Sequence, residues 1–523
     1  MSLQKPRPHQ IILIALGIMV IILGTMIFLY PTAIFPDSSW GFQVLQKMQA
    51  GGDFNLAVKP SQSDISKSYT EFLTWWSPGQ YLVPYAFILI FGINIGQASA
   101  ITITIFTLLG LAGFYSFFKK AGFTPIIATV SVVIIACQQA FIIPFVFYNG
   151  GEVLIFGTIG WFLYGLVAID KADWKLAVFL LLSGWVGFFC KSSFLWMYAA
   201  GCLYLWIKLS SGQATIVNWI KKGLWIGIPA IISLGVIYIS YLSKGVNPAS
   251  GSTGLKLTLE TFSFPLASPI LSGFSVDDLM GGLLYHYDVG MLNAFWSLIA
   301  VLLAAVLSIL IITRIAQRVP EKRYTLLVTV FYCVSVVFFF YNFLRQVNIS
   351  YEARHMRVIG LLIIPGIVYL VSKSNLTLKA AFAMICFIIA FFSVRYFVPS
   401  YKQNMADNAR GTTGLAQIFA DQESLNYIMD LDRKNTNALF VFISPDLGLE
   451  IKHNRIVTLD PIDDDISIDY DDYVHRGHAG PIFIFLPASY MGPKSNIVRK
   501  CFPGYKGFRM EMLSNDYVLY SAK

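Results

Sequence analysis

Long apolar stretches constrain the fold of this chain more than any other feature of its sequence. Between Ile11 and Val394 the chain repeatedly presents apolar runs of about 17 to 22 residues, and a helix of that length crosses a hydrocarbon core about 30 Å thick. Of the 523 residues, 56% are hydrophobic and 13% are charged, whereas soluble domains average about 25% charged residues. The pattern predicts an all-α polytopic membrane domain with about eleven transmembrane helices.

The segment at residues 72–92 decides the expected topology. It is apolar enough to span the membrane, but Pro78, Gly79 and Pro84 interrupt it, and its paired tryptophans suit the outer membrane interface. We therefore expect an interfacial helix there. The expected spans are 11–30, 98–118, 125–147, 153–169, 176–189, 193–207, 223–242, 291–312, 324–344, 358–372 and 378–394.

With these spans, the basic residues of every expected inner loop fall on the same side as Lys5 and Arg7. This positive-inside pattern predicts a cytoplasmic N-terminus in the plasma (inner) membrane. Larger outer loops are then expected at 31–95 and 243–290, with a short outer turn at 148–152.

Charged residues return after residue 395, where short apolar runs alternate with a helical pattern. We expect a transmembrane catalytic domain at 1–395, whose first extracytoplasmic loop (31–95) carries interfacial helices. A small extracytoplasmic α/β domain with four or five strands is expected at 396–523. Six aspartates between Asp463 and Asp472 indicate a solvated loop rather than a cation site.

Several function classes find no support in the sequence. The formal charge of +9 resides in short loops beside apolar runs, where it sets orientation rather than binding nucleic acid. Five of the six cysteines lie in or beside apolar runs, so there is no disulfide framework. The phosphate-binding G-x-x-x-x-G-K-[ST] loop and the H-E-x-x-H zinc motif are absent.

Asp37 is the leading candidate for a catalytic carboxylate. It closely follows the first span in FPDSSWGFQVLQKMQAGGDF, where Trp40, Val44, Leu45 and Met48 recur at helical spacing. This spacing predicts an amphipathic helix along the outer interface with a carboxylate at its start. Helix capping is an equally good interpretation of Asp37, and the two roles are compatible.

Other candidates are ionisable residues at the expected outer membrane boundary. Glu152 ends the turn YNGGE, and Lys191 lies between two apolar runs on the expected outer side. An ionisable group at membrane depth is costly and is therefore a functional candidate, although each could simply be an interfacial charge. Arg354, His355 and Arg357 precede a late span, and guanidinium groups match phosphate geometry.

The sequence does not require a cofactor. His286, in LLYHYDVG, is a single imidazole in the expected outer loop. A lone histidine is more often structural, but His286 with Asp37 or Glu152 would be an acceptable ligand set for a divalent cation.

The order of these features resembles the glycosyltransferase C superfamily, in particular the lipid A aminoarabinose transferase and protein mannosyltransferase families. PDSSW, MQAGGDF and WWSPGQYLVPYAFILIFG resemble its acidic, amphipathic and proline-containing elements, and RHMR its basic start to a late helix. Glu152 resembles its second acidic residue and Lys191 the lysine after its fifth span. Two positions depart from the pattern: Ser38 follows Asp37 in place of a second acid, and Ser77 replaces one of two prolines.

The resemblance implies an integral membrane glycosyltransferase that uses a polyprenyl-phosphate-linked sugar and an extracytoplasmic glycan, lipid or protein acceptor. Asp37 would act as general base on the acceptor, with inversion at the anomeric carbon. Arg354, His355 and Arg357, together with Lys191, would bind the donor phosphate, with Glu152 as a second catalytic carboxylate. Two alternatives are a lipid-linked glycan transporter or flippase and a non-catalytic subunit of an envelope glycan assembly machine.

Overall fold

The chain divides into two compact units in the computed structural model. The structure describes residues 7–212, 215–246, 254–279, 292–347, 349–406, 409–459, 473–492 and 496–523. The first unit comprises Met1–Gly24, Ile103–Phe145 and Gly151–Pro399, and the second comprises Thr25–Thr102, Val146–Gly150 and Ser400–Lys523.

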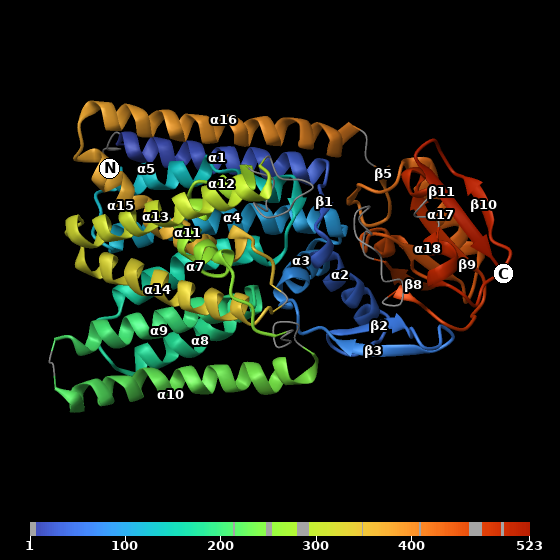
Figure 1. Cartoon of the computed structure of the whole chain (residues 1–523), viewed down its shortest axis with the longest axis horizontal. Helices are drawn as coiled ribbons and strands as arrows, with labels where there is room; N and C mark the ends of the chain where they lie inside the picture. Colours follow the sequence, from blue (N-terminus) through green and yellow to red (C-terminus); the bar gives the residue numbers. More distant parts are fainter. Residues whose placement is uncertain are drawn as a thin grey trace. The chain divides into compact units, whose positions relative to one another are not determined.

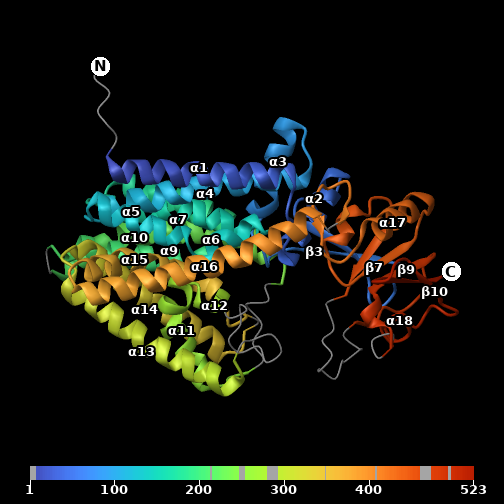
Figure 2. The same cartoon turned by 90° about the horizontal axis from the view of Figure 1, so that it is seen from above.

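The first unit is a bundle of helices that run side by side (Figure 1, Figure 2). The helices that lie in it, wholly or for most of their length, are α1 (Pro8–Leu29), α4 (Ile95–Lys120), α5 (Pro125–Ala136), α6 (Gln139–Ile142), α7 (Gly151–Ala168), α8 (Trp174–Cys190), α9 (Phe194–Ser210), α10 (Ile216–Ser240), α11 (Leu259–Gly273), α12 (Val276–Leu279), α13 (Ala294–Arg318), α14 (Lys322–Leu344), α15 (Arg357–Ser372) and α16 (Leu376–Ala406).

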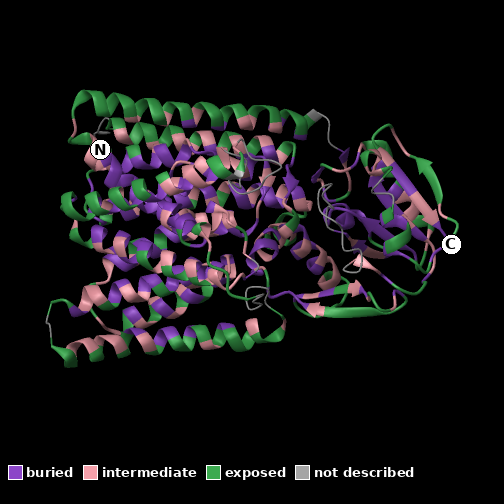
Figure 3. Ribbon diagram, viewed as in Figure 1, coloured by how far each residue is buried: buried purple, intermediate pink, exposed green. Residues whose placement is uncertain are grey.

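Within the described ranges, eight helices are long and apolar enough to cross a membrane: α1, α4, α7, α10, α13, α14, α16, and α15 with the turn before it. The bent pair at residues 125–145 raises the number to nine. Helices α8 and α9 have 17 residues each, about 26 Å at 1.5 Å per residue. The outer helices α10 and α16 expose apolar side chains along much of their length (Figure 3). The chain is a multi-pass integral membrane protein.

The segment expected as one span at 125–147 is not a continuous helix, because the chain bends by 71° between Ala136 and Gln139. Polar side chains at the bend bond to another part of the unit rather than to lipid. The Gln138 side-chain amide is buried and donates a 2.7 Å hydrogen bond to the Gly273 carbonyl. A membrane helix breaks where such groups find protein partners.

The expected outer loop at 243–290 is also partly wrong, since it contains the mostly buried helix α11. This helix packs against α13 and α15. A Cβ atom added at Gly360 of α15 would lie 2.2 Å from the Gly273 backbone nitrogen, so the two backbones approach closely. Pro265, Pro269 and several serines lower the apolar character of α11 below that of a typical span, which explains why the sequence pattern missed it.

The second unit contains the α/β fold expected for the tail. Its five-stranded sheet has the order β10-β11-β9-β7-β8. The strands are β7 (Leu439–Phe442), β8 (Arg455–Thr458), β9 (Ile482–Pro487), β10 (Arg509–Met512) and β11 (Tyr517–Ala522), with helices α17 (Gln422–Lys434) and α18 (Asn496–Cys501). Strands β8, β7 and β9 are parallel neighbours, and β10 and β11 pair antiparallel. Alternating side chains build a core on each sheet face, one with α18 residues and one with α17 residues.

The same unit includes the segment that follows the first span. Its elements are β1 (Ala33–Ile34), α2 (Pro36–Gln49), the antiparallel pair β2 (Leu56–Pro60) and β3 (Ser68–Phe72), α3 (Gly79–Phe91) and β4 (Phe147–Tyr148). The helix α3 contains Pro84 and has 13 residues, about 20 Å, which is shorter than a span. The connection between β2 and β3 contacts the C-terminal sheet, because Arg455 Nη1 donates a 2.6 Å hydrogen bond to the Ile65 carbonyl. The acidic run at 463–472 lies outside the described residues.

Candidate functional site

Glu152 and Lys191 form an ion pair in the first unit. Glu152 lies in the first turn of α7, where a carboxylate suits the positive end of the helix dipole. Lys191 is the residue that ends α8. Its Nζ atom lies 2.5 Å from Glu152 Oε1, and the two side chains are only 15% and 23% exposed. The pair therefore lies in a largely desolvated position, where a charge is stable only with a partner.

A second cation faces the same carboxylate. Arg354 lies in the 3-10 turn η4 (Ala353–Met356), and its Nη1 atom is 3.7 Å from Glu152 Oε1. Arg354 also pairs with Glu352 through its Nε atom. His355 follows on the same turn, with its Nε2 atom 3.5 Å from Ser350 Oγ. The structure thus brings together Glu152, Lys191 and Arg354 from three separate helix ends.

Two aspartates that the sequence analysis did not select hold the start of α15. Asp278 Oδ1 lies 3.0 Å from Arg357 Nη2, and Asp277 Oδ2 accepts a 2.8 Å hydrogen bond from the Ala353 backbone. Burial raises the pKa of Asp277 to about 7. The signal that could have found them is the adjacent acidic pair in VDDL, directly after a run with few charged residues.

The carboxylates of Glu152 and Asp278 position the cations of this cluster. A guanidinium has five N–H groups and a lysine ammonium has three. Lys191, Arg354 and Arg357 each contact a carboxylate through part of that set. Positively charged groups held in this way suit an added anion such as a phosphate.

Asp37 lies in the second unit, in the first turn of α2. The helix begins at Pro36 and its N-cap residue is Phe35, so the interpretation of Asp37 as the residue that caps from before the helix is wrong. Its charge still suits the dipole. The start of α2 is fixed by β4, because the Phe35 backbone donates a 2.9 Å hydrogen bond to the Tyr148 carbonyl. Gly150 has a φ of +57°, and a Cβ atom added there would lie 2.4 Å from Ser38 Oγ. The turn after β4 therefore passes close to the first turn of α2 and requires a glycine at position 150.

The predicted site residues are thus distributed over both units. Glu152, Lys191, Arg354, His355 and Arg357 belong to the first and Asp37 to the second. His286 lies outside the described residues. Within the ranges that the structure describes, no group of three or more His, Cys, Asp or Glu residues could hold a metal ion.

One solved structure identifies the fold. No protein-family model and no curated protein sequence matches the chain. The apo crystal structure of ArnT from Cupriavidus metallidurans matches it with a TM-score of 0.51 at 11% identity, over 97% of each chain. This chain has the glycosyltransferase C fold. The expected fold class, an all-α membrane domain with a small C-terminal α/β domain, is confirmed by this likeness.

Two further structures with the glycosyltransferase C fold show weaker similarity. ArnT bound to undecaprenyl phosphate matches with a TM-score of 0.47 at 10% identity, over 98% of this chain and 97% of ArnT. The arabinofuranosyltransferase AftD from Mycobacteria matches with a TM-score of 0.48 at 10% identity, over 98% of this chain and 39% of AftD.

Proposed function

We propose that this protein transfers a sugar from a polyprenyl-phosphate donor to an extracytoplasmic glycan, lipid or protein acceptor, with inversion at the anomeric carbon. The observation that carries the proposal is the contact of Lys191 and Arg354 with one carboxylate, Glu152, at the ends of membrane helices. Basic groups in so desolvated a position suit the phosphate of a membrane-delivered donor. The glycosyltransferase C fold supports the same class of reaction.

In the proposed mechanism, the fixed cations stabilise the departing lipid phosphate. Lys191, Arg354 and Arg357 donate hydrogen bonds to phosphate oxygens as negative charge grows on them. Glu152 and Asp278 hold these cations in place and so reduce the reorganisation that binding requires. The bound ligand of one ArnT structure, undecaprenyl phosphate, is a phosphate of this kind.

Asp37 serves as general base in this mechanism. Its carboxylate accepts the proton of the acceptor hydroxyl or amine while the acceptor oxygen or nitrogen attacks the anomeric carbon. The bond to the phosphate oxygen breaks on the opposite face, which inverts the anomeric centre. Because the donor carries its own leaving group, the reaction needs no nucleotide site. This chemistry requires Asp37 on the extracytoplasmic side, with the N-terminus in the cytoplasm.

An assay with purified protein tests the proposal. The protein, reconstituted in nanodiscs, is given a panel of radiolabelled polyprenyl-phosphate sugars and an extract of envelope glycans and lipids. Transfer of label from at least one donor to a non-prenyl product supports the proposal. Movement of an intact lipid-linked sugar across a vesicle membrane without such transfer would favour a flippase instead.

A further inference from the structure

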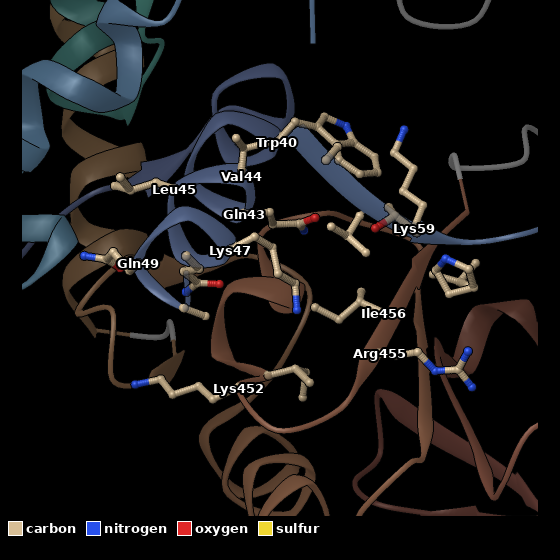
Figure 4. Close-up of a pocket in the computed structure, with 18 of the residues that line it drawn as sticks. Trp40, Gln43, Val44, Leu45, Lys47, Gln49, Lys59, Lys452, Arg455 and Ile456 are labelled. Atoms are coloured by element: carbon tan, nitrogen blue, oxygen red, sulfur yellow. The ribbon is translucent and has the colours of Figure 1, made fainter. Parts of the chain in front are cut away.

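A cavity of about 760 Å³ lies within the second unit, between α2, the β2–β3 pair and β8. Figure 4 shows Lys47 extending from α2 toward Ile456 and the segment that carries Lys452. Typical small-molecule sites have volumes of about 300 to 1,000 Å³. The cavity is therefore large enough for two or three sugar rings, and far too large for an inorganic anion alone.

The described residues that line this cavity are strongly biased in charge. They include Lys47, Lys59, Lys452 and Arg455 but no aspartate or glutamate. Lys59 is paired with Glu71, 3.2 Å away, and its Nζ atom lies 4.7 Å from the centre of the Trp40 ring. Among the described residues, Lys47 and Lys452 form no ion pair. Burial lowers the pKa of His475, which also lines the cavity, so His475 adds no charge at neutral pH.

Arg455 adds a positive charge with a fixed position to the cavity lining. Its Nη1 atom donates to the Ile65 carbonyl at 2.6 Å, which fixes the guanidinium in one orientation. Its Nε and Nη2 atoms are buried and have no hydrogen-bond partner among the described residues. A buried charged donor without an acceptor is costly. Because these two atoms have almost no accessible surface, Arg455 would attract an anionic ligand in the cavity through its charge and not by direct hydrogen bonds.

Amide side chains line the same cavity. Gln43 donates its amide N–H to the Pro445 carbonyl at 2.6 Å, and Gln46 donates to the Leu449 carbonyl at 2.8 Å. These bonds orient both amides, and each amide oxygen can accept a hydrogen bond from a hydroxyl group. Oriented amides beside unpaired cations match a ligand that carries both hydroxyl groups and negative charge.

We propose that this cavity binds an anionic saccharide whose carboxylate or phosphate group contacts Lys47, with Lys452 and Arg455 adding positive charge to the lining. In the proposed reaction this ligand is the acidic part of the acceptor glycan. Only its assignment as acceptor rests on the proposed function, because the binding site itself follows from the cavity.

Binding of defined probes to the full-length protein in nanodiscs tests the site by calorimetry. The probes are trigalacturonate, a phosphorylated maltotriose, neutral maltotriose and inorganic phosphate. We expect at least one acidic trisaccharide to bind about tenfold or more tightly than maltotriose and phosphate. Added salt should weaken the binding of that acidic trisaccharide. The two acidic probes distinguish a carboxylate from a phosphate ligand. Equal affinity for acidic and neutral trisaccharides, or binding of none of them, would overturn the proposal.

Matched variants locate the binding. Arg455→Gln should weaken binding of the acidic trisaccharide several-fold, since one positive charge of the cavity lining is lost. Because Arg455 also holds Ile65, the partly exposed Lys47→Gln provides a second variant, expected to weaken binding several-fold. The control is Lys67→Gln, an exposed lysine of the same unit outside the cavity, which should have no effect. Unchanged affinity in both cavity variants would contradict the site.

The two proposals fail separately. Acidic saccharide binding without transfer from any polyprenyl-phosphate sugar would reject the proposed function and leave the binding site standing. Transfer without saturable binding of either acidic trisaccharide would reject the binding site alone.

Discussion

The Nζ atom of Lys191 lies 2.5 Å from Oε1 of Glu152, and Arg354 Nη1 lies 3.7 Å from the same oxygen. One carboxylate thus holds two cations that come from elements far apart in sequence. Since all three side chains are at most 25% exposed, the arrangement depends on mutual pairing rather than on solvent.

Removing one member of this pair should destabilise the protein. We predict that Lys191→Met lowers the free energy of unfolding by about 2 to 4 kcal/mol, because Glu152 is left with fewer partners in a desolvated position. The double variant Lys191→Met with Glu152→Gln should recover part of that loss. Thermal unfolding in detergent measures both effects. Additive losses in the double variant would show that the pair is not energetically coupled.

Asp278 should affect the apparent KM for the lipid donor, because its carboxylate fixes the position of Arg357. Asp278→Asn weakens the 3.0 Å contact that fixes the guanidinium, and Arg357→Ala removes the guanidinium itself. We predict that Arg357→Ala raises the apparent KM for the lipid donor about ten- to a hundredfold and that Asp278→Asn raises it less. The matched control is Arg345→Ala, because Arg345 contacts the Tyr341 ring. An unchanged donor KM in Arg357→Ala would count against the phosphate role.

Stability should fall as pH rises through the titration of Asp277. Burial raises its pKa from 3.8 to about 7, so the folded protein retains a proton that the unfolded chain loses above pH 4. The stabilising effect of the neutral form is complete below pH 4 and is lost as pH rises to about 7, a change of about 4 kcal/mol. Asp277→Asn should lack this decline. Unfolding of both proteins between pH 4.5 and 8 measures the difference, and parallel pH profiles would contradict the assignment.

The proposed orientation can be tested with cysteine labelling. Ser63→Cys, in the exposed connection after β2, should react with a membrane-impermeant maleimide added to intact cells, whereas Gly212→Cys, after α9, should react only after lysis. The native protein, with its cysteines mostly within apolar helices, provides the background. Labelling of position 212 rather than 63 in intact cells would reverse the topology.

The sequence predicted those features that depend on local pattern. Apolar run length predicted helices at each of the expected spans, and alternating short runs predicted four or five strands in the tail, where the structure has a five-stranded sheet. The proline-rich segment before residue 92 was correctly distinguished from a full span, since α3 has only 13 residues. Features that depend on tertiary partners were missed. Helix α11 is buried despite its two prolines because it packs against the neighbouring helices α13 and α15.

The candidate site shows the same division. Glu152, Lys191 and Arg354 stood out because an ionisable residue beside an apolar run is conspicuous. Their mutual contact could not be predicted, since it joins residues up to about 200 positions apart in the chain. Asp277 and Asp278 were missed because they lie in what was expected to be an outer loop. Acidic residues are common in solvated loops and do not indicate a site there.

Sugar transfer by an Asp37 variant tests the central claim most directly. The purified protein and its Asp37→Asn variant are compared with a radiolabelled polyprenyl-phosphate sugar and acceptor, with Asp53→Asn, an exposed aspartate of the same unit, as control. We predict that Asp37→Asn stays folded and binds the donor but transfers sugar about 100- to 10,000-fold more slowly, while Asp53→Asn remains active. Transfer by Asp37→Asn at the native rate would contradict the assignment of Asp37 as the base.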